Sequence, residues 1–527
     1  MTNRKKTIVL FHPKLTQPKE NKEQVRFAPL GILAVSAPLL EKGYNVIVVD
    51  SNIGESWKNK NINIEDVICI GISAMTGYQI KDGLMFAHFI REQKPDIPIV
   101  WGGVHVSLMP EQSLENNLVD IVVLGQGEET FCDLVEHLIK NIPLDYVKGI
   151  YFKKDGSIVK NKKRAFVNPD NFPPAPYYIL DIPNYFSETK TKKLRSSDAF
   201  LGKEERFIYY CSSIGCPYRC RFCASSKQTE GKWVGFSAER VLNDIEKLIK
   251  DYKITSLQFC DAEFFINKKR AKDIAQGFID RNFNIKWKAQ VRADTFDNLS
   301  DEDVLLLKNS GYIHVEIGAE TGSERMLKYI NKRITTDMVI RCAEKIKKHK
   351  LLSSFCLVFG FPTETLKDVH DTFRLASKLK ELLPKTLLPI YFFDPYPGVP
   401  LYFDSIEQGM IPPKSLEEWA NIKPDMRKPS PLIPWIDKKF MDYVHKVIIF
   451  YLPLAFPANI GLGTLTYVED KLKNSKTRYI IWIGHKLAKW RVKHQFFSFP
   501  FEWQLFKLYN KLLRIKQQSL KYIKERA

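Results

Sequence analysis

The sequence lacks the features that mark secreted and repetitive chains. Its first residues, "MTNRKKTIVLF", hold only about five apolar residues in a row before His12 and Pro13, too few for the hydrophobic core of a signal peptide. It contains no internal repeat of fixed period and no low-complexity tract. We therefore expect a cytoplasmic globular protein whose cysteines stay reduced.

The sequence also has little that would form a membrane-spanning helix. Its least charged stretch, residues 447–465, contains Pro453, Pro457 and two glycines. Proline and glycine interrupt a helix, and a spanning helix needs about 20 predominantly apolar residues without such interruptions. We expect no regular spanning helix here.

What the chain does have is a long α/β pattern. Its 527 residues, 44% of them apolar, are too many for one core and indicate two or three domains. Continuous apolar strands separated by helical patterns predict parallel sheets. We expect a doubly wound, Rossmann-like domain over residues 1–145, a linker or wrapping segment over 146–200, a barrel or partial TIM barrel over 201–400, and a basic helical region over 401–527.

Four of the nine cysteines lie within "CSSIGCPYRCRFC". Cys216, Cys220 and Cys223 form a C-x₃-C-x₂-C pattern directly after a predicted strand. Cys211 lies in that strand, and we expect it to be a buried core thiol. Structural zinc usually takes two separated ligand pairs, and an ordinary four-iron ferredoxin cluster takes a fourth cysteine at fixed spacing. Three thiolates on one loop favour an iron–sulfur cluster with one open iron, and a zinc or redox site is the alternative.

This cysteine pattern at the end of a first barrel strand, with Phe222 before the third cysteine, resembles the radical S-adenosylmethionine (SAM) superfamily. The resemblance implies a [4Fe-4S] cluster held by Cys216, Cys220 and Cys223. In that superfamily the open iron chelates SAM, and one electron cleaves SAM to a 5′-deoxyadenosyl radical. An external donor of the flavodoxin or ferredoxin type would supply the electron.

Later strand ends are similar to the same superfamily. The resemblance places Asp261 and Glu263, in "FCDAEFF", near the SAM amino group, and Arg292 near the SAM carboxylate. It places Glu316 and Glu320, in "VEIGAETGS", at the ribose hydroxyls, and "LVFGFPTET" near the adenine. For each of these residues the alternative is a surface charge or a helix cap.

A doubly wound domain placed before such a barrel resembles the cobalamin-binding domain of B12-dependent radical SAM enzymes. Ser73, Gly102 and Gly103 match positions that line the groove for the cobalamin nucleotide tail. The Asp-x-His-x-x-Gly motif that supplies a histidine ligand to cobalt is absent. We expect His105 to be a loop or packing histidine, and contact with the cofactor is the less favoured alternative.

The chain is similar to the anaerobic Mg-protoporphyrin cyclase and hopanoid methylase group. This implies methylation of an unactivated carbon on a lipid-like or secondary-metabolite substrate. One alternative is an oxidative cyclase or rearrangement enzyme without methyl transfer. Another is an RNA-modifying enzyme, although such enzymes carry ligand cysteines in their N-terminal domain, and Cys69 and Cys132 have no cluster spacing.

The formal net charge of +20 is concentrated at the C-terminus. From Lys471 to Ala527 there are fifteen Lys and Arg residues against two acidic residues, a net charge of +13. Aromatic and aliphatic residues alternate with these cations, as in helices that lie on a membrane surface. We expect peripheral association with the inner face of the membrane and no nucleic-acid partner, because no known nucleic-acid-binding module is present. The alternative is that these helices only cap the barrel.

Overall fold

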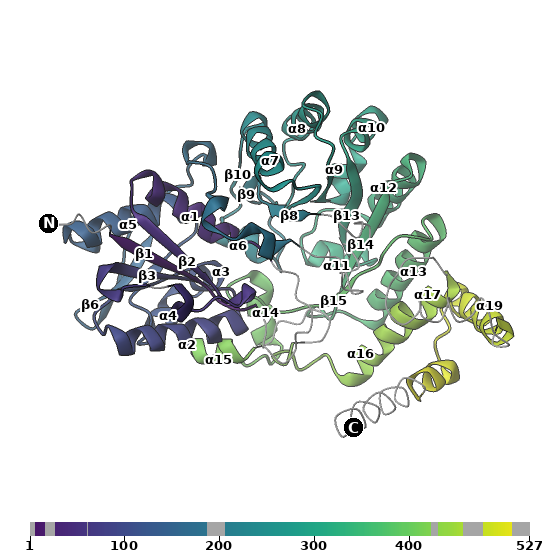
Figure 1. Cartoon of the computed structure of the whole chain (residues 1–527). Coiled ribbons are helices and arrows are strands. Elements are labelled where there is room, and N and C mark those ends of the chain that lie inside the picture. The colour runs from purple at the N-terminus through teal and green to yellow at the C-terminus, as the bar shows by residue number, and fades with distance from the viewer. Residues whose placement is uncertain are drawn as a thin grey trace, which may run out of the picture.

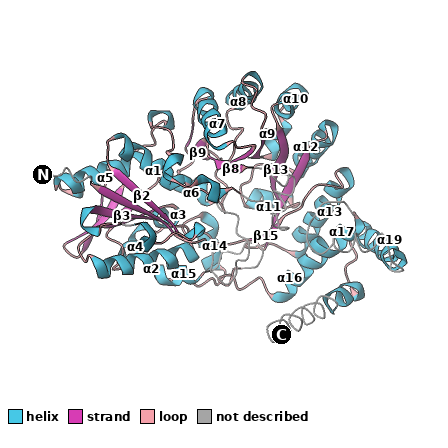
Figure 2. Ribbon diagram, in the orientation of Figure 1, coloured by secondary structure: helices cyan, strands magenta, loops and turns pink. Residues whose placement is uncertain are grey.

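The computed structural model contains two mainly parallel sheets that lie side by side, followed by helices that return to both of them (Figure 1). It describes residues 6–15, 27–60, 62–186, 206–422, 430–456 and 478–508. Helices cover the sheets throughout, as the cyan and magenta elements show (Figure 2).

The first sheet has the strand order β2-β1-β3-β4-β5-β6-β7. Its strands are β1 (Thr7–His12), β2 (Asn45–Asp50), β3 (Val67–Ser73), β4 (Ile99–Gly102), β5 (Ile121–Val123), β6 (Ile150–Lys154) and β7 (Ser157–Lys160). The first five are parallel. Helices α1 (Leu30–Glu41) and α5 (Glu128–Lys140) cover one face, and α2 (Tyr78–Gln93), α3 (Val104–Leu108) and α4 (Pro110–Glu115) cover the other. The predicted doubly wound architecture is confirmed.

This sheet extends beyond residue 145, which differs from the irregular segment expected over residues 146–200. The strands β6 and β7 form an antiparallel hairpin on β5. Asp155 and Gly156 close the hairpin with positive φ angles of 49° and 77°, and Asp-Gly is a favoured pair in such turns. The sequence did not predict this hairpin because its strands are short and rich in lysine. From residue 169 to 186 the chain forms short 3₁₀ turns, and residues 187–205 lie outside the described part.

The second sheet contains the six predicted barrel strands, in chain order and all parallel. They are β8 (Phe207–Tyr210), β11 (Ser256–Phe259), β12 (Lys286–Val291), β13 (Tyr312–Glu320), β14 (Leu352–Phe359) and β15 (Ile390–Phe392). The strands β8 and β15 form its two edges, so the sheet is an open half barrel. Its carboxyl ends all lie at one rim, where an α/β fold places its ligands.

Helices with defined starts cover the outside of this half barrel. They are α7 (Ala238–Tyr252), α8 (Lys268–Asp280), α9 (Ala293–Asp297), α10 (Asp301–Asn309), α11 (Glu324–Tyr329), α12 (Thr336–His349) and α13 (Leu366–Leu382). Six of them begin after a capping side chain that accepts a backbone N–H, namely Ser237, Asn267, Ser300, Ser323, Thr335 and Thr365. Each such cap stabilises its helix by about 1 kcal/mol. A short antiparallel pair, β9 (Ser213–Gly215) and β10 (Trp233–Gly235), brackets the cysteine loop and α6 (Ala224–Gln228).

The C-terminal region is helical, as predicted, but it serves both sheets. Helices α14 (Pro400–Glu407) and α15 (Leu416–Asn421) return to the first sheet, where Trp419 is buried and donates a 2.7 Å hydrogen bond to Gln112. Helix α16 (Lys438–His445), a π-helical turn (Lys446–Tyr451), α17 (Leu452–Ala455) and α19 (Arg478–His494) pack onto the barrel core. Residues 501–508 are also helical, and residues 423–429, 457–477 and 509–527 of the predicted basic region lie outside the described part.

A search of the described residues for a helix long and apolar enough to cross a membrane finds none.

Candidate cofactor site

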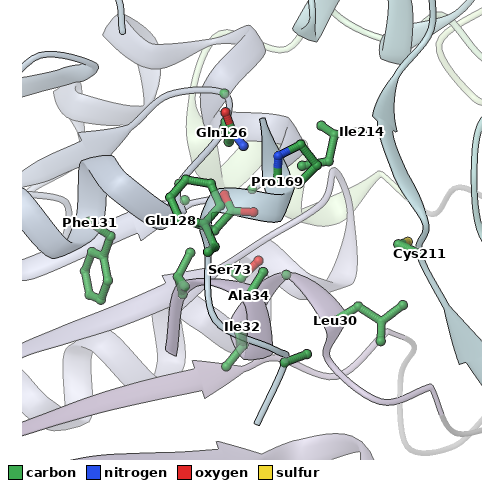
Figure 3. A pocket seen from close by; sticks show the side chains of 18 of the residues that line it. Leu30, Ile32, Ala34, Ser73, Gln126, Glu128, Phe131, Pro169, Cys211 and Ile214 are labelled. Carbon is green, nitrogen blue, oxygen red and sulfur yellow. The ribbon is translucent and has the colours of Figure 1, made fainter. Parts of the chain in front are cut away.

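A cavity of about 710 Å³ lies between the carboxyl ends of the two sheets. One wall comes from the N-terminal domain, a second from the segment after β7, and a third from the ends of β8 and β11. Figure 3 shows Ser73 and Glu128 of the first domain opposite Cys211 and Ile214 of the barrel, with Pro169 between them. Ligand sites of this volume and composition are the ordinary places for small molecules and cofactors.

Small residues build the N-terminal wall. The structure brings Ser73, Gly102 and Gly103 together there, at the ends of β3 and β4. A Cβ atom on Gly102 would meet no protein atom within 4 Å, so it would project into open space. Gly103 has a φ of +97°, and a Cβ atom there would be 2.7 Å from the carbonyl oxygen of Ala74. The backbone can therefore approach a large ligand closely, and direct contact of these three residues with cobalamin stays a prediction.

No histidine is among the residues that line this cavity. His105 is buried behind the wall, where its Nδ1 is 2.9 Å from Thr76 Oγ1 and its ring lies 5.5 Å from the Trp419 ring. Burial lowers the pKa of His105 to about 4, so the imidazole is neutral. His105 therefore packs against Thr76 and Trp419 behind the cavity wall, as the prediction of a packing histidine expects.

The three loop cysteines lie on the barrel side of the cavity. Gly215 and Ser225, which flank the loop, line the cavity, and Cys216, Cys220 and Cys223 are free thiols between them. Gly215 has a φ of +85°, and a Cβ atom there would be 2.2 Å from the Lys232 carbonyl, so only glycine fits before Cys216.

The donor set fits a four-iron cluster better than a single ion. Within the described residues, no three His, Cys, Asp or Glu side chains are grouped closely enough to hold one metal ion. A cubane binds one thiolate at each of three irons. Cys216, Cys220 and Cys223 are three free thiols on one loop, which is the type and number of donors that such a cluster with one open iron would take.

Two cations lie beside the second of these thiols. The Arg292 Nη1 is 3.9 Å from the Cys220 Sγ, and Lys332 acts on Cys220 electrostatically. Burial raises the pKa of Cys220, while Lys332 and Arg292 oppose that rise. Burial also raises the pKa of Cys216 to about 11. The cations therefore favour thiolate at Cys220, the form that binds iron.

Arg292 connects the cysteine loop to the rim of the sheet. Its guanidinium lies 3.7 Å from the centre of the Tyr218 ring and forms an ion pair with Asp294. Its backbone N–H donates a 2.6 Å hydrogen bond to Glu263. Glu263 is buried, and this desolvation raises its pKa to about 7. These contacts hold Arg292 beside the loop, where its predicted role toward the SAM carboxylate stays a prediction.

The carboxylate of Asp261 is already fully engaged. It accepts hydrogen bonds from Ser212 N (2.7 Å), Ser212 Oγ (2.6 Å) and Ser213 Oγ (2.6 Å), and only 2% of the residue is exposed. It therefore ties the end of β11 to the chain that leaves β8 toward the cysteine loop. This geometry supports a positioning role, whereas its predicted contact with the SAM amino group stays untested.

The remaining predicted residues lie on the same rim. Glu320 forms a buried ion pair with Lys332, with 2.5 Å between Oε1 and Nζ. Glu316 accepts a 3.0 Å hydrogen bond from Gln290 and is partly exposed. The Phe222 ring lies 5.7 Å from the Phe361 ring, at the end of β14.

The sequence did not predict three features of this site: Lys332, Tyr218 and the cavity wall formed by residues 169–177. Lys332 follows α11 and belongs to none of the sequence motifs described above. Its position twelve residues after Glu320 was the one sequence feature that could have suggested the ion pair between the two. Tyr218 is an ordinary loop residue by sequence. Residues 169–177 belong to the predicted linker or wrapping segment, and the sequence did not indicate that Pro169, Phe172 and Tyr177 line the cavity.

Comparison with known proteins agrees with both halves of this site. A family model described as the radical SAM superfamily matches residues 210–376, and one described as the B12 binding domain matches residues 24–135. An uncharacterized methyltransferase, PH0819 of Pyrococcus horikoshii, is 30% identical over 404 residues, which are 76% of this chain and 83% of that protein. The anaerobic magnesium-protoporphyrin IX monomethyl ester cyclase of Synechocystis sp. is 25% identical over 435 residues, 81% of this chain and 78% of that protein.

Two solved structures share the fold. The cobalamin-dependent radical enzyme OxsB with aqua-cobalamin bound superposes with a TM-score of 0.66 at 19% identity, covering 97% of this chain and 75% of that one. The methyltransferase TsrM of Kitasatospora setae, with cobalamin and a [4Fe-4S] cluster, gives a TM-score of 0.60 at 16% identity, covering 78% and 76%. The chain thus has the fold of cobalamin-dependent radical SAM proteins.

Replacing Asp261 by Ala should destabilise the cofactor-free protein by about 3 kcal/mol, because it leaves buried Ser212 and Ser213 donors without their acceptor. Thermal unfolding measures this. Asp273→Ala, on the exposed side of α8, is the matched control and should have little effect. An Asp261→Ala variant that unfolds normally but fails to bind SAM would contradict the positioning role.

Replacing Gly102 by Val should weaken cobalamin binding at least tenfold while leaving the unfolding temperature of the cofactor-free protein unchanged. The new side chain would occupy cavity space and meet no protein atom within 4 Å at its Cβ. Corrinoid absorbance after gel filtration measures retention. Normal retention of cobalamin by this variant would show that the corrinoid does not lie against Gly102.

Proposed function

Because the chain belongs to the radical SAM enzymes that carry an N-terminal B12-binding domain, we propose that it methylates an unactivated carbon of a small-molecule or lipid-like substrate. The observation that carries the proposal is the single cavity that both sheets share. Its N-terminal wall includes glycines suited to a corrinoid, and its barrel wall includes Gly215 and Ser225, the two residues that flank the cysteine loop.

The residues at the two sheet edges and on the cysteine loop would hold three cofactors. Cys216, Cys220 and Cys223 would bind three irons of a [4Fe-4S] cluster, and Gly102 and Gly103 would lie against cobalamin. Arg292 would meet the SAM carboxylate, and Glu263, Glu316 and Glu320 would accept hydrogen bonds from SAM, with Phe222 beside it. When bound, the cluster supplies the electron that cleaves SAM, and cobalamin supplies a transferable methyl group.

The chain's own contribution is positioning and exclusion of water. Glu263 fixes the backbone of Arg292, and the Lys332–Glu320 pair fixes the end of β13. Apolar residues of both domains and of the intervening segment, including Leu30, Ile214 and Phe172, enclose the cavity. An apolar lining limits the access of water to a reactive substrate carbon and so protects it from side reactions. The rigid rim therefore suits a reaction whose two cofactors must face one carbon.

Oxidative cyclisation without methyl transfer is the second candidate, and the similarity to the magnesium-protoporphyrin cyclases favours it. The RNA-modifying alternative has less support. Cys69 and Cys132 are buried in β3 and α5, and both take part in the core of the first domain. Neither lies in a loop where a second cluster would be expected.

The proposal includes two partners. SAM cleavage consumes an electron, which a flavodoxin or ferredoxin would supply from outside. The basic C-terminal region, with its net charge of +13 over residues 471–527, would place the enzyme at the inner face of the cytoplasmic membrane.

Replacing Cys216, Cys220 and Cys223 together by Ala should remove both the cluster and 5′-deoxyadenosine formation. Anaerobic reconstitution followed by iron analysis should give about four irons per chain in the parent protein and close to none in the variant. Cys132→Ala, in a buried helix of the other domain, is the control and should retain the cluster. SAM cleavage by the triple variant would refute the cluster assignment.

Cells that carry the gene should contain a metabolite or lipid that gains one labelled methyl group when they are fed methyl-labelled methionine. Mass spectrometry of extracts with and without the gene measures this. A gene-dependent product that loses hydrogens and takes up no label would contradict methyl transfer and establish cyclisation instead.

A further inference from the structure

Large apolar side chains are exposed together at the end of the described chain. We define the C-terminal patch by six of them: Trp490 (49% exposed), Phe496 (42%), Phe499 (84%), Phe501 (61%), Leu505 (62%) and Leu508 (54%). They come from α19, from the turn after it and from the helical residues 501–508. Single exposed apolar residues are common on proteins, but a concentration of this kind marks an interaction surface.

The outward orientation of this patch follows from one buried arginine. Arg491 is 4% exposed and donates to the carbonyl oxygens of Phe496 (3.1 Å), Ser498 (2.9 Å) and Phe499 (3.0 Å). It also forms a 2.6 Å ion pair with Glu502. The backbone of the turn is thereby held against Arg491, and the aromatic rings of Phe499 and Phe501 remain in solvent.

The residues beneath the patch are already paired within the protein. Trp503 is buried, and its ring lies 5.5 Å from the Phe450 ring of the π-helical turn. Its Nε1 donates to Asp442, which also accepts from Lys507. The helical residues 501–508 therefore have one face on the barrel, and Phe501, Leu505 and Leu508 follow one another at helical spacing on the exposed side.

The charge around the patch is positive. Lys486, Lys489 and Lys493 are exposed on α19. Within residues 478–508 the single acidic residue is Glu502, which Arg491 neutralises. Exposed aromatic and aliphatic side chains flanked by lysines match an anionic bilayer, in which the rings enter the headgroup layer and the lysines meet lipid phosphates.

We propose that the C-terminal patch docks this protein onto the surface of an anionic phospholipid membrane. Net positive charge disfavours a second copy of the chain as the occupant, because like charges would face each other across the contact. The surface lies at the end of the molecule far from the N-terminal sheet (Figure 1), and none of its six residues lines the cofactor cavity. Docking therefore leaves the cavity free, and the inference does not depend on which reaction the site performs.

The test is flotation of the full-length protein with vesicles in a density gradient. Vesicles containing phosphatidylglycerol should carry the protein upward, and vesicles of phosphatidylcholine alone should not. Raising the salt from about 0.1 M to about 1 M should weaken binding, because it shortens the screening length from about 10 Å to about 3 Å. Phe501→Gln with Leu505→Gln should reduce binding at least tenfold, and so should Lys489→Glu with Lys493→Glu.

Matched controls separate a surface effect from a general one. Tyr146→Gln with Ile411→Gln removes two even more exposed side chains, one aromatic and one aliphatic, elsewhere on the protein, and Lys81→Glu with Lys250→Glu changes the same charge on α2 and α7. Both should leave vesicle binding intact, and all variants should retain SAM cleavage in solution. A parent protein that cleaves SAM but does not float with phosphatidylglycerol vesicles would overturn the docking inference and leave the proposed reaction untouched. Dimerisation that the patch variants abolish, or binding to RNA in place of vesicles, would also overturn it.

Discussion

The shared direction of the parallel strands, five in the first sheet and six in the second, is the constraint on which the site depends. In a parallel sheet every strand ends at the same edge, so the loops that follow them gather on one side. Here two such edges face one cavity, with Ser73 and Gly102 ending strands on one side and Cys211 following β8 on the other. Cofactors bound to different domains can then reach one substrate. Family membership explains which cofactors these are, and the geometry explains why they need a shared cavity.

The rim of the half barrel is held by charges that the protein has removed from water. Lys332 and Glu320 are both largely buried, and Arg292 is buried beside Asp294 and the Tyr218 ring. Burying an ion costs several kcal/mol unless a partner and further hydrogen bonds compensate it. Pairs of this kind add little net stability, but they fix the direction of each side chain. These contacts hold Arg292 beside Cys220, where it and Lys332 favour the thiolate form of that side chain.

Much of the fold was predictable because the physical signals were local and repeated. Apolar strands followed by amphipathic helices predicted all six barrel strands, and the cysteine spacing predicted the loop at the end of the first. The hairpin of β6 and β7 was missed because its strands are only partly buried and carry several lysines. Lys332 and the wall formed by Pro169 and Phe172 were missed because their roles arise from contacts between segments far apart in the sequence. No local sequence pattern indicates contacts between such distant segments.

The central claim is that cobalamin and the iron–sulfur cluster face one shared cavity from opposite sides, and their electron spins test it most directly. In protein loaded with both cofactors, the relaxation rate of cob(II)alamin should be measured by electron paramagnetic resonance with the cluster oxidised and with it reduced. The account predicts that reducing the cluster accelerates cob(II)alamin relaxation, and that the triple cysteine variant loses this effect. A cob(II)alamin signal that does not change when the cluster is reduced would contradict the shared cavity.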